Sequence, residues 1–133
     1  MTILGIEFAS NHMNYLVLEQ NEHGELAVLG ANRITLAETR SPDALRAFQR
    51  AVQTLLQDAA PDLLAIKEKP EKGAMQAGAA ALKMESIVLA NTGCTIQFVS
   101  GARINKCQTA FPSSLKVYHQ SAFQAAACAA KGR

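Results

Sequence analysis

Two places in this chain carry side chains suited to metal or phosphate chemistry. Glu7 lies near the end of the apolar segment 2–9, and Lys67-Glu68 directly follows the apolar run 63–66. Carboxylate oxygens are hard ligands for Mg²⁺, and Lys binds phosphate as a compact positive charge. Glu7 is therefore a candidate metal ligand, with a solvent-facing strand end as the alternative. Glu68 belongs to the charged stretch 67–72, which is typical of a solvated loop, with a catalytic carboxylate as the alternative.

The segments that must position these residues follow from hydrophobic periodicity. Residues 2–9, 13–20 and 25–36 run apolar or alternate and are separated by short turns, which predicts an antiparallel meander of three strands. Ser41-Pro42-Asp43 predicts a helix start, and the apolar positions that follow it are spaced by three and four residues. The later elements are predicted as a buried strand 63–66, a long helix 73–91, a strand 95–99, a short helix 103–107 and a last helix capped by Ser113 or Ser114. The apolar stripe of the helix 73–91 is expected to consist of Met75, Ala79, Leu82, Ser86 and Leu89. The expected fold is an α/β mixed five-stranded sheet with helices on both faces, in a single domain 1–133.

Composition limits the class of protein. The hydrophobic fraction of 49% and the charged fraction of 18% indicate a folded chain. No apolar run is long enough to cross a membrane and no signal peptide is visible, so we expect a cytoplasmic protein. Its three cysteines (Cys94, Cys107 and Cys128) form no CxxC pair, which favours reduced thiols. His12 and His119 have no partner at metal-binding spacing and are expected at the surface, with His119 near Ser121 and Gln124 as the alternative.

Charge is distributed unevenly along the chain. Residues 1–66 hold four Arg against eight acidic residues, a net −4, and residues 67–133 hold nine Lys or Arg against three acidic residues, a net +6. Such an excess predicts a basic face for phosphate backbones, with ordinary solvated surface Lys as the alternative. The chain has no P-loop and no GxGxxG, so the sequence does not support nucleotide binding.

The order of elements and several short motifs resemble the ribonuclease-H-like superfamily, and within it the RuvC-type Holliday-junction resolvases. The segment 3–10 resembles their opening strand, with Glu7 at the position of a catalytic aspartate. The segment 65–68 resembles a strand that ends on a catalytic glutamate, and Ser121-Ala122-Phe123-Gln124-Ala125 resembles a D-x-x-D-A motif. The chain also resembles a small bacterial family of unknown function in that superfamily.

The resemblance implies a nuclease that holds two Mg²⁺ ions between carboxylates and clamps the scissile phosphate. In direct register Lys67 stands where the family has its glutamate, and Glu68 is one residue late, which turns a strand side chain to the opposite face. Ser121 and Gln124 stand at two aspartate positions. The implied metal ligands are Glu7, Glu68 and Gln124, with Lys67 as a cation that substitutes for a metal charge. The expected cofactor is weakly bound Mg²⁺.

We therefore predict a nucleic-acid-associated protein whose metal-dependent nuclease activity is weak or lost. Its expected partners are branched DNA or an RNA-containing duplex, with no membrane and a possible homodimer. The alternative is a non-catalytic binding or assembly module, indicated by Lys67 rather than Glu68 beside Glu7 and by an Ala-rich helix face left for dimerisation. The substrate-binding candidates are Lys67, Lys69, Lys72, Gly73 and Arg103.

Overall fold

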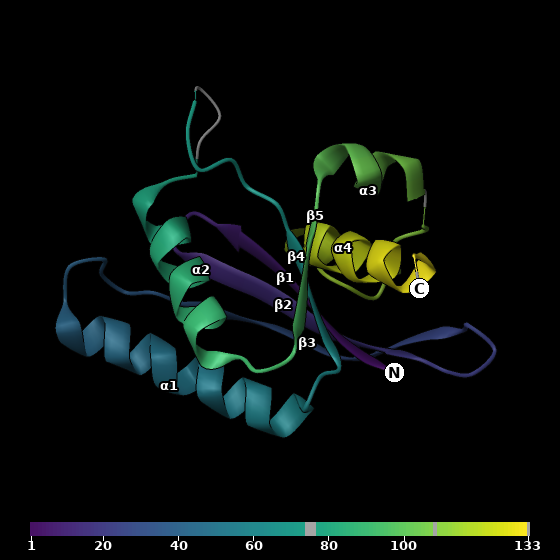
Figure 1. The fold of residues 1–133 in the computed structure, drawn as a ribbon, viewed down its shortest axis with the longest axis horizontal. Coiled ribbons are helices and arrows are strands. Elements are labelled where there is room, and N and C mark those ends of the chain that lie inside the picture. Colours follow the sequence, from purple (N-terminus) through teal and green to yellow (C-terminus); the bar gives the residue numbers. More distant parts are fainter. Residues whose placement is uncertain (74–76, 108, 133) are drawn as a thin grey trace.

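The computed structural model describes residues 1–73, 77–107 and 109–132, and within them five strands form one mixed sheet (Figure 1). The spatial order is β3-β2-β1-β4-β5. The first three strands pair antiparallel, and β4 and β5 extend the sheet parallel to β1. The bounds are β1 Thr2–Ala9, β2 His12–Gln20, β3 Leu26–Thr35, β4 Leu63–Lys67 and β5 Thr95–Val99. The predicted meander and mixed sheet are confirmed.

Helices cover both faces of this sheet (Figure 1). Helices α1 (Pro42–Ala59) and α2 (Ala79–Asn91) pack on one face, over a core that includes the even-numbered residues of β1. Helix α4 (Gln120–Lys131) packs on the other face together with α3 (Gly101–Cys107). Because strand side chains alternate between faces, each residue of β1 belongs to one of these two layers.

Helix α1 begins as its sequence predicts. The Ser41 side chain accepts a hydrogen bond of 3.2 Å from the backbone N–H of Ala44, and Pro42 opens the helix. Phe48 and Val52 from the predicted apolar stripe are buried in the core. The helix ends where Ala60 adopts a left-handed conformation with φ of 43°.

Two other helix predictions need correction. Helix α2 begins at Ala79 rather than Gly73, and its buried residues are Ala81, Met84 and Val88. Leu89 of the predicted stripe is 37% exposed, and Met75 lies outside the described residues. The pattern was misleading because nearly every residue of this helix is small or apolar, so spacing alone does not select one face.

The last helix also begins later than the sequence predicts. Neither Ser113 nor Ser114 caps it, because a short 3₁₀ helix, η1 (Val117–His119), leads directly into α4 at Gln120. The Ala-rich part of α4 is buried against the sheet. Gly5 of β1 permits this approach, since a Cβ atom there would overlap the Ala122 carbonyl and lie 2.9 Å from the Ala126 side chain.

The cysteine and histidine predictions are partly wrong. Cys107 of α3 and Cys128 of α4 form a disulfide with their Cα atoms 5.6 Å apart, and Cys94 is a free thiol. The residues are 21 positions apart, and only the packing of α3 on α4 brings them together. His119 is buried, with 3% of its surface exposed, and its ring nitrogen Nε2 lies 2.9 Å from the Asn32 carbonyl oxygen of β3. None of the described helices has the length and apolar character that a membrane span requires.

Candidate functional site

Four polar residues lie side by side across four neighbouring strands, on the face that α4 covers. Register pairs Asn14 of β2 with Glu7 of β1 on one side and with Arg33 of β3 on the other. Ile6 pairs with Ile66, so Lys67 of β4 follows beside Glu7. We call Arg33, Asn14, Glu7 and Lys67 the polar row. In this order across the sheet, the four side chains are positive, neutral, negative and positive.

The neighbouring row of residues, which includes Gly5 of β1 and Ala65 of β4, shows which face of the sheet the polar row occupies. That row is apolar, and Gly5 within it contacts Ala122 and Ala126 of α4. Ala65, the partner of Gly5 in β4, belongs to the same buried cluster as α4. Glu7 and Lys67 each come two residues later in their strands and therefore point to the same face.

Glu7 has one basic side chain within ion-pair distance and another on the neighbouring strand. Its carboxylate Oε2 lies 4.0 Å from Lys69 Nζ, and the two side chains are 14% and 26% exposed, respectively. Lys67 stands beside it at the end of β4. Glu7, the candidate metal ligand, is thus accompanied by two cations from the segment that follows Ile66.

Asn14 and Arg33 belong to the same site, and sequence reasoning missed them. Arg33 donates from Nε to the Asn14 side-chain oxygen at 3.0 Å, and Asn14 is 1% exposed. The Arg33 guanidinium carbon also lies 3.9 Å from the centre of the Tyr118 ring. One signal was available: a polar Asn inside an apolar strand stands opposite Glu7 once the tight turn after Ala9 sets the hairpin register.

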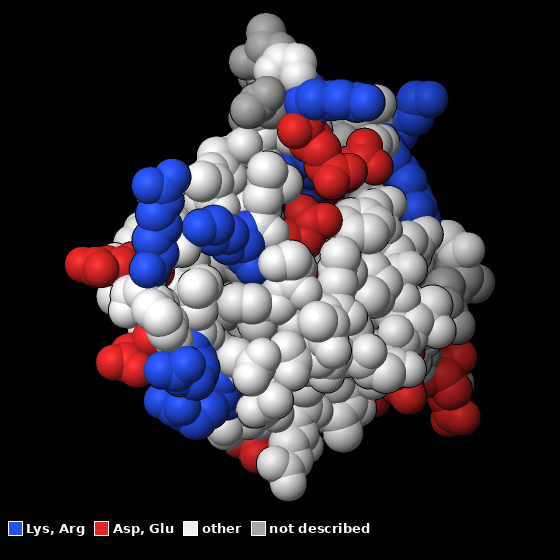
Figure 2. Space-filling model, turned by 60° about the vertical axis from the view of Figure 1, so that its left-hand side comes forward, with Lys and Arg blue, Asp and Glu red and all other residues white. Residues whose placement is uncertain are grey.

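Glu68 lies in a different environment from Glu7. Successive side chains along β4 point to opposite faces of the sheet, so Glu68 lies on the α2 side, as Ile66 does. The backbone N–H of Glu68 donates to the Val99 carbonyl at 2.9 Å. Glu68, Glu71 and Glu85 line a hollow of about 300 Å³ with Phe98. Figure 2 shows acidic side chains gathered beside basic ones at the end of the molecule that carries the loop between β4 and α2.

This acidic group affects the ionisation of Glu85. Partial burial raises the pKa of the Glu85 carboxyl above its ordinary value, and the negative charge of Glu71 raises it further. Neighbouring carboxylates repel one another, so a second charge is harder to form here. Lys69, which lies 4.0 Å from the Glu7 carboxylate, also lines this hollow.

The other predicted residues are dispersed. Lys69 lies at ion-pair distance from Glu7, and it also lines a hollow of about 410 Å³ with Ser10 and the first turn of α2. Lys72 and Gly73 are exposed in the loop after β4, where Gly73 adopts a φ of 96° that favours glycine. The structure does not place them beside Glu7.

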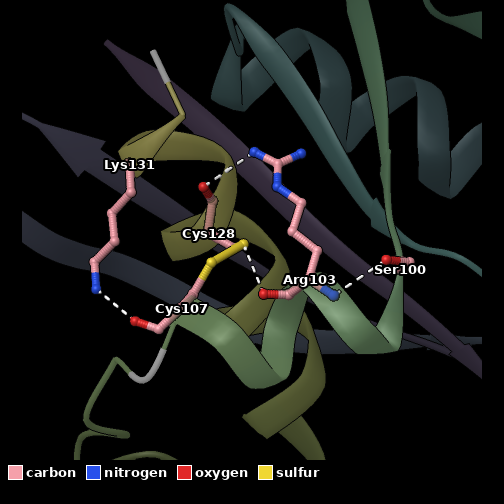
Figure 3. Close-up of a disulfide and its surroundings, with 5 residues drawn as sticks. All are labelled: Ser100, Arg103, Cys107, Cys128 and Lys131. Atoms are coloured by element: carbon pink, nitrogen blue, oxygen red, sulfur yellow. Dashed lines mark hydrogen bonds between the residues drawn. A yellow bond between two sulfur atoms is a disulfide. The ribbon is translucent and has the colours of Figure 1, made fainter.

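Arg103 faces the far half of α4. Its guanidinium donates to the Cys128 carbonyl at 3.4 Å, and its backbone N–H binds the Ser100 hydroxyl at 3.1 Å. Figure 3 shows Arg103 and Lys131 on either side of the disulfide. Arg103 therefore holds α3 to α4.

Ser121 and Gln124 are half-buried near the start of α4, three residues apart and thus on one side of the helix. They supply a hydroxyl and an amide where the resemblance implies aspartates. On the face of Glu7, the donor set consists of one carboxylate, neutral groups and two Lys. Among the described residues, no three His, Cys, Asp or Glu side chains are grouped so as to hold a metal ion. This set does not fit a two-metal centre, which needs several carboxylates to balance the charge of the ions.

Solved structures share this fold at low sequence identity. Thermus thermophilus RuvC is 12% identical with a TM-score of 0.82, covering 100% of this chain and 96% of that one. The T. thermophilus RuvC in complex with a Holliday junction substrate is 14% identical with a TM-score of 0.74 and covers the same shares. The fowlpox virus Holliday junction resolvase is 9% identical with a TM-score of 0.63, covering 100% of both chains. The fold is therefore that of RuvC within the ribonuclease-H-like class, as predicted.

Sequence comparison assigns a family. No curated protein matches the chain. Residues 1–130 match a family described as "Protein of unknown function (DUF3010)", which is nearly the whole chain. The chain belongs to the DUF3010 family.

Proposed function

We propose that this protein binds nucleic acid at the polar row and that its metal-dependent nuclease activity is weak or absent. The observation that carries the proposal is the position of Lys67. It stands beside Glu7 on the α4 face, and Glu68 points to the opposite face.

A cation at that position opposes metal binding. Adjacent strands lie about 4.8 Å apart, so Lys67 and Glu7 occupy neighbouring positions on one face, and a positive charge there disfavours a divalent ion at Glu7. Lys69 adds a second positive charge at 4.0 Å from the Glu7 carboxylate. A lone carboxylate between two Lys is paired already and has little capacity to hold Mg²⁺.

The same charges favour a phosphate backbone. Lys67, Lys69 and Arg33 carry three positive charges against the single negative charge of Glu7. Each cation that neutralises a phosphate releases a condensed counterion, which drives binding and makes it sensitive to salt. Support also comes from the fold, because T. thermophilus RuvC has been solved with a Holliday junction. We therefore expect a branched DNA or RNA-containing duplex as the ligand.

The alternative, an assembly module, also predicted Lys67 beside Glu7, but it predicted in addition a free Ala-rich helix face. The Ala-rich residues of α4 are buried under the sheet and do not form a surface for a second copy. An exposed Leu29, at 64%, on the edge strand β3 is the feature that favours self-association. Sedimentation of the protein alone, with Leu29→Ser as the test variant, separates this alternative from nucleic-acid binding.

The test of the proposed function is binding without metal. Fluorescence anisotropy compares a four-way DNA junction and a linear duplex in EDTA and then in Mg²⁺, with cleavage followed on gels. We expect binding in EDTA and little or no Mg²⁺-dependent cleavage.

Two charge-matched variants identify the surface. Lys67→Gln removes one phosphate contact, so the slope of log K against log salt should fall in magnitude by about 0.9. Arg50→Gln removes the same charge from the exposed surface of α1 on the other side of the sheet and should leave the slope unchanged. Equal effects of the two substitutions, or rapid Mg²⁺-dependent cleavage, would contradict the proposal.

A further inference from the structure

The segment before α4 folds over the edge of β3, next to the polar row. His119 donates from Nε2 to the Asn32 carbonyl at 2.9 Å. The Tyr118 ring lies 4.5 Å from the His119 ring, and Arg33 packs on Tyr118 at 3.9 Å. These contacts tie η1 to the end of the polar row that Arg33 forms.

Val117 projects from this packed segment. It is 82% exposed, although Tyr118 is half-buried and His119 is buried. A single exposed apolar side chain is ordinary on a protein surface. Here, however, it lies among cationic and aromatic groups: Lys116 Nζ is 5.6 Å from the Tyr118 ring centre, and Arg33 packs on the same ring. We call Arg33, Lys116, Val117 and Tyr118 the β3 corner.

The β3 corner is preorganised. Arg33 is held at Nε by Asn14 and at its guanidinium plane by Tyr118, so it loses little side-chain entropy on binding a ligand. Unstacked bases stack on Arg planes and aromatic rings, and extruded bases are also held between aromatic and apolar side chains. The four residues include two cations and no acid, which matches a phosphodiester chain rather than an acidic or neutral apolar surface.

The distance to Lys67 suits a nucleic acid that lies across the sheet. Strands β3 and β4 are separated by β2 and β1, a span of three strand spacings or about 14 Å. Duplex nucleic acid rises about 3.4 Å per step along one strand, so a backbone bound at Lys67 reaches the β3 corner within a few nucleotides.

We propose that the β3 corner binds an unpaired nucleotide of the nucleic acid whose phosphates lie on the polar row. The base contacts Val117, and Arg33 and Lys116 bind the adjoining phosphate. This inference rests on the proposed function and specifies its ligand: the protein prefers structures with unstacked nucleotides, such as branch points and bulges, to continuous duplex.

The experiment uses the full chain in EDTA and two labelled DNA ligands of equal length, a continuous duplex and the same duplex with three unpaired central nucleotides. Wild-type protein should bind the bulged ligand at least fivefold more tightly, because an unpaired base can cover the exposed Val117 side chain and a base stacked in the duplex cannot. Val117→Ser should remove that preference and leave duplex affinity within twofold. Leu29→Ser, which changes another exposed apolar residue, should retain the preference. A second readout is the fluorescence of 2-aminopurine at the unpaired position, which should change on binding wild type but not Val117→Ser.

The outcomes separate the two proposals. If wild type binds both ligands equally, or if Val117→Ser and Leu29→Ser behave alike, the β3 corner does not bind an unpaired nucleotide and the polar row can still bind duplex. If neither ligand binds, both proposals fail. Circular-dichroism melts of each variant establish that a lost preference does not reflect unfolding.

Discussion

Glu7 and Lys67 stand side by side on parallel neighbouring strands and face the same layer of the molecule. The resemblance to RuvC-type resolvases implies a carboxylate at each of these two positions. Here it supplies one carboxylate and one ammonium, and Lys69 approaches the same carboxylate to 4.0 Å. We propose that the charge of this pair decides whether the site attracts cations or anions.

Reversing the charge of Lys67 should convert the site to a cation site. Lys67→Glu places a second carboxylate about 4.8 Å along the sheet from Glu7. We expect Mg²⁺ or Mn²⁺ to raise the melting temperature of this variant, with about 1.4 kcal/mol of stabilisation at ten times its Kd. Wild type should show no such specific rise. A response that persists in Lys67→Glu combined with Glu7→Gln would place the metal elsewhere.

Removing the Glu7 carboxylate should strengthen nucleic-acid binding. Glu7→Gln leaves Lys67 and Lys69 without their counter-charge, so both become available to phosphate. We expect severalfold tighter binding in anisotropy at fixed salt, because one repulsive charge is removed. Glu22→Gln, in an exposed turn, is the matched control and should change little. Weaker binding by Glu7→Gln would mean that Glu7 contacts the ligand directly.

Gly5 should be required for the packing of α4. Gly5→Ala places a Cβ atom against the Ala122 carbonyl and the Ala126 side chain, so the helix must move. Overpacking of this kind costs about 1–3 kcal/mol of unfolding free energy. Gly30→Ala in β3 is the control, since a Cβ atom there meets nothing within 4 Å. Urea denaturation measures both, and similar free energies would show that α4 does not approach β1 as described.

The acidic group on the α2 face should make stability depend on pH. Because the folded pKa of Glu85 is raised above its ordinary value of 4.5, the folded state binds a proton more readily than the unfolded state. This contribution is favourable below about pH 4.5 and is lost as the pH rises through the folded pKa. Glu85→Gln should therefore raise the melting temperature at pH 7, and the gain should shrink as the pH falls through the raised folded pKa of Glu85 towards 4.5. A gain that stays constant with pH would exclude this cause.

The disulfide between Cys107 and Cys128 should stabilise the α3–α4 layer. It closes a loop between residues 21 positions apart, for which chain entropy predicts about 3 kcal/mol of stabilisation. Dithiothreitol should lower the melting temperature of wild type and have no effect on Cys107→Ser. Cys94→Ser should behave like wild type, because Cys94 is outside the bridge. Insensitivity of wild type to reductant would contradict a formed disulfide.

Hydrophobic patterns and the capping residues Ser41-Pro42 determined the succession of the strands along the chain and the start of α1. Runs such as 63–66 and the cap at Ser41 are local signals, which can be recognised without knowing which distant residues they will contact. The position of Glu7 near a strand end was predicted for the same reason. The side of β4 on which Lys67 and Glu68 fall also follows from alternation, once β4 is placed beside β1.

The tertiary structure decided which side chains meet. Asn14 and Arg33 join Glu7 only through the register of three strands, and Lys69 reaches Glu7 only through the course of the loop after β4. The burial of His119, the start of α4 at Gln120 and the pairing of Cys107 with Cys128 depend on contacts with elements far away in the chain. Such contacts have no local signature, because their free energy is gained only when the separate layers pack.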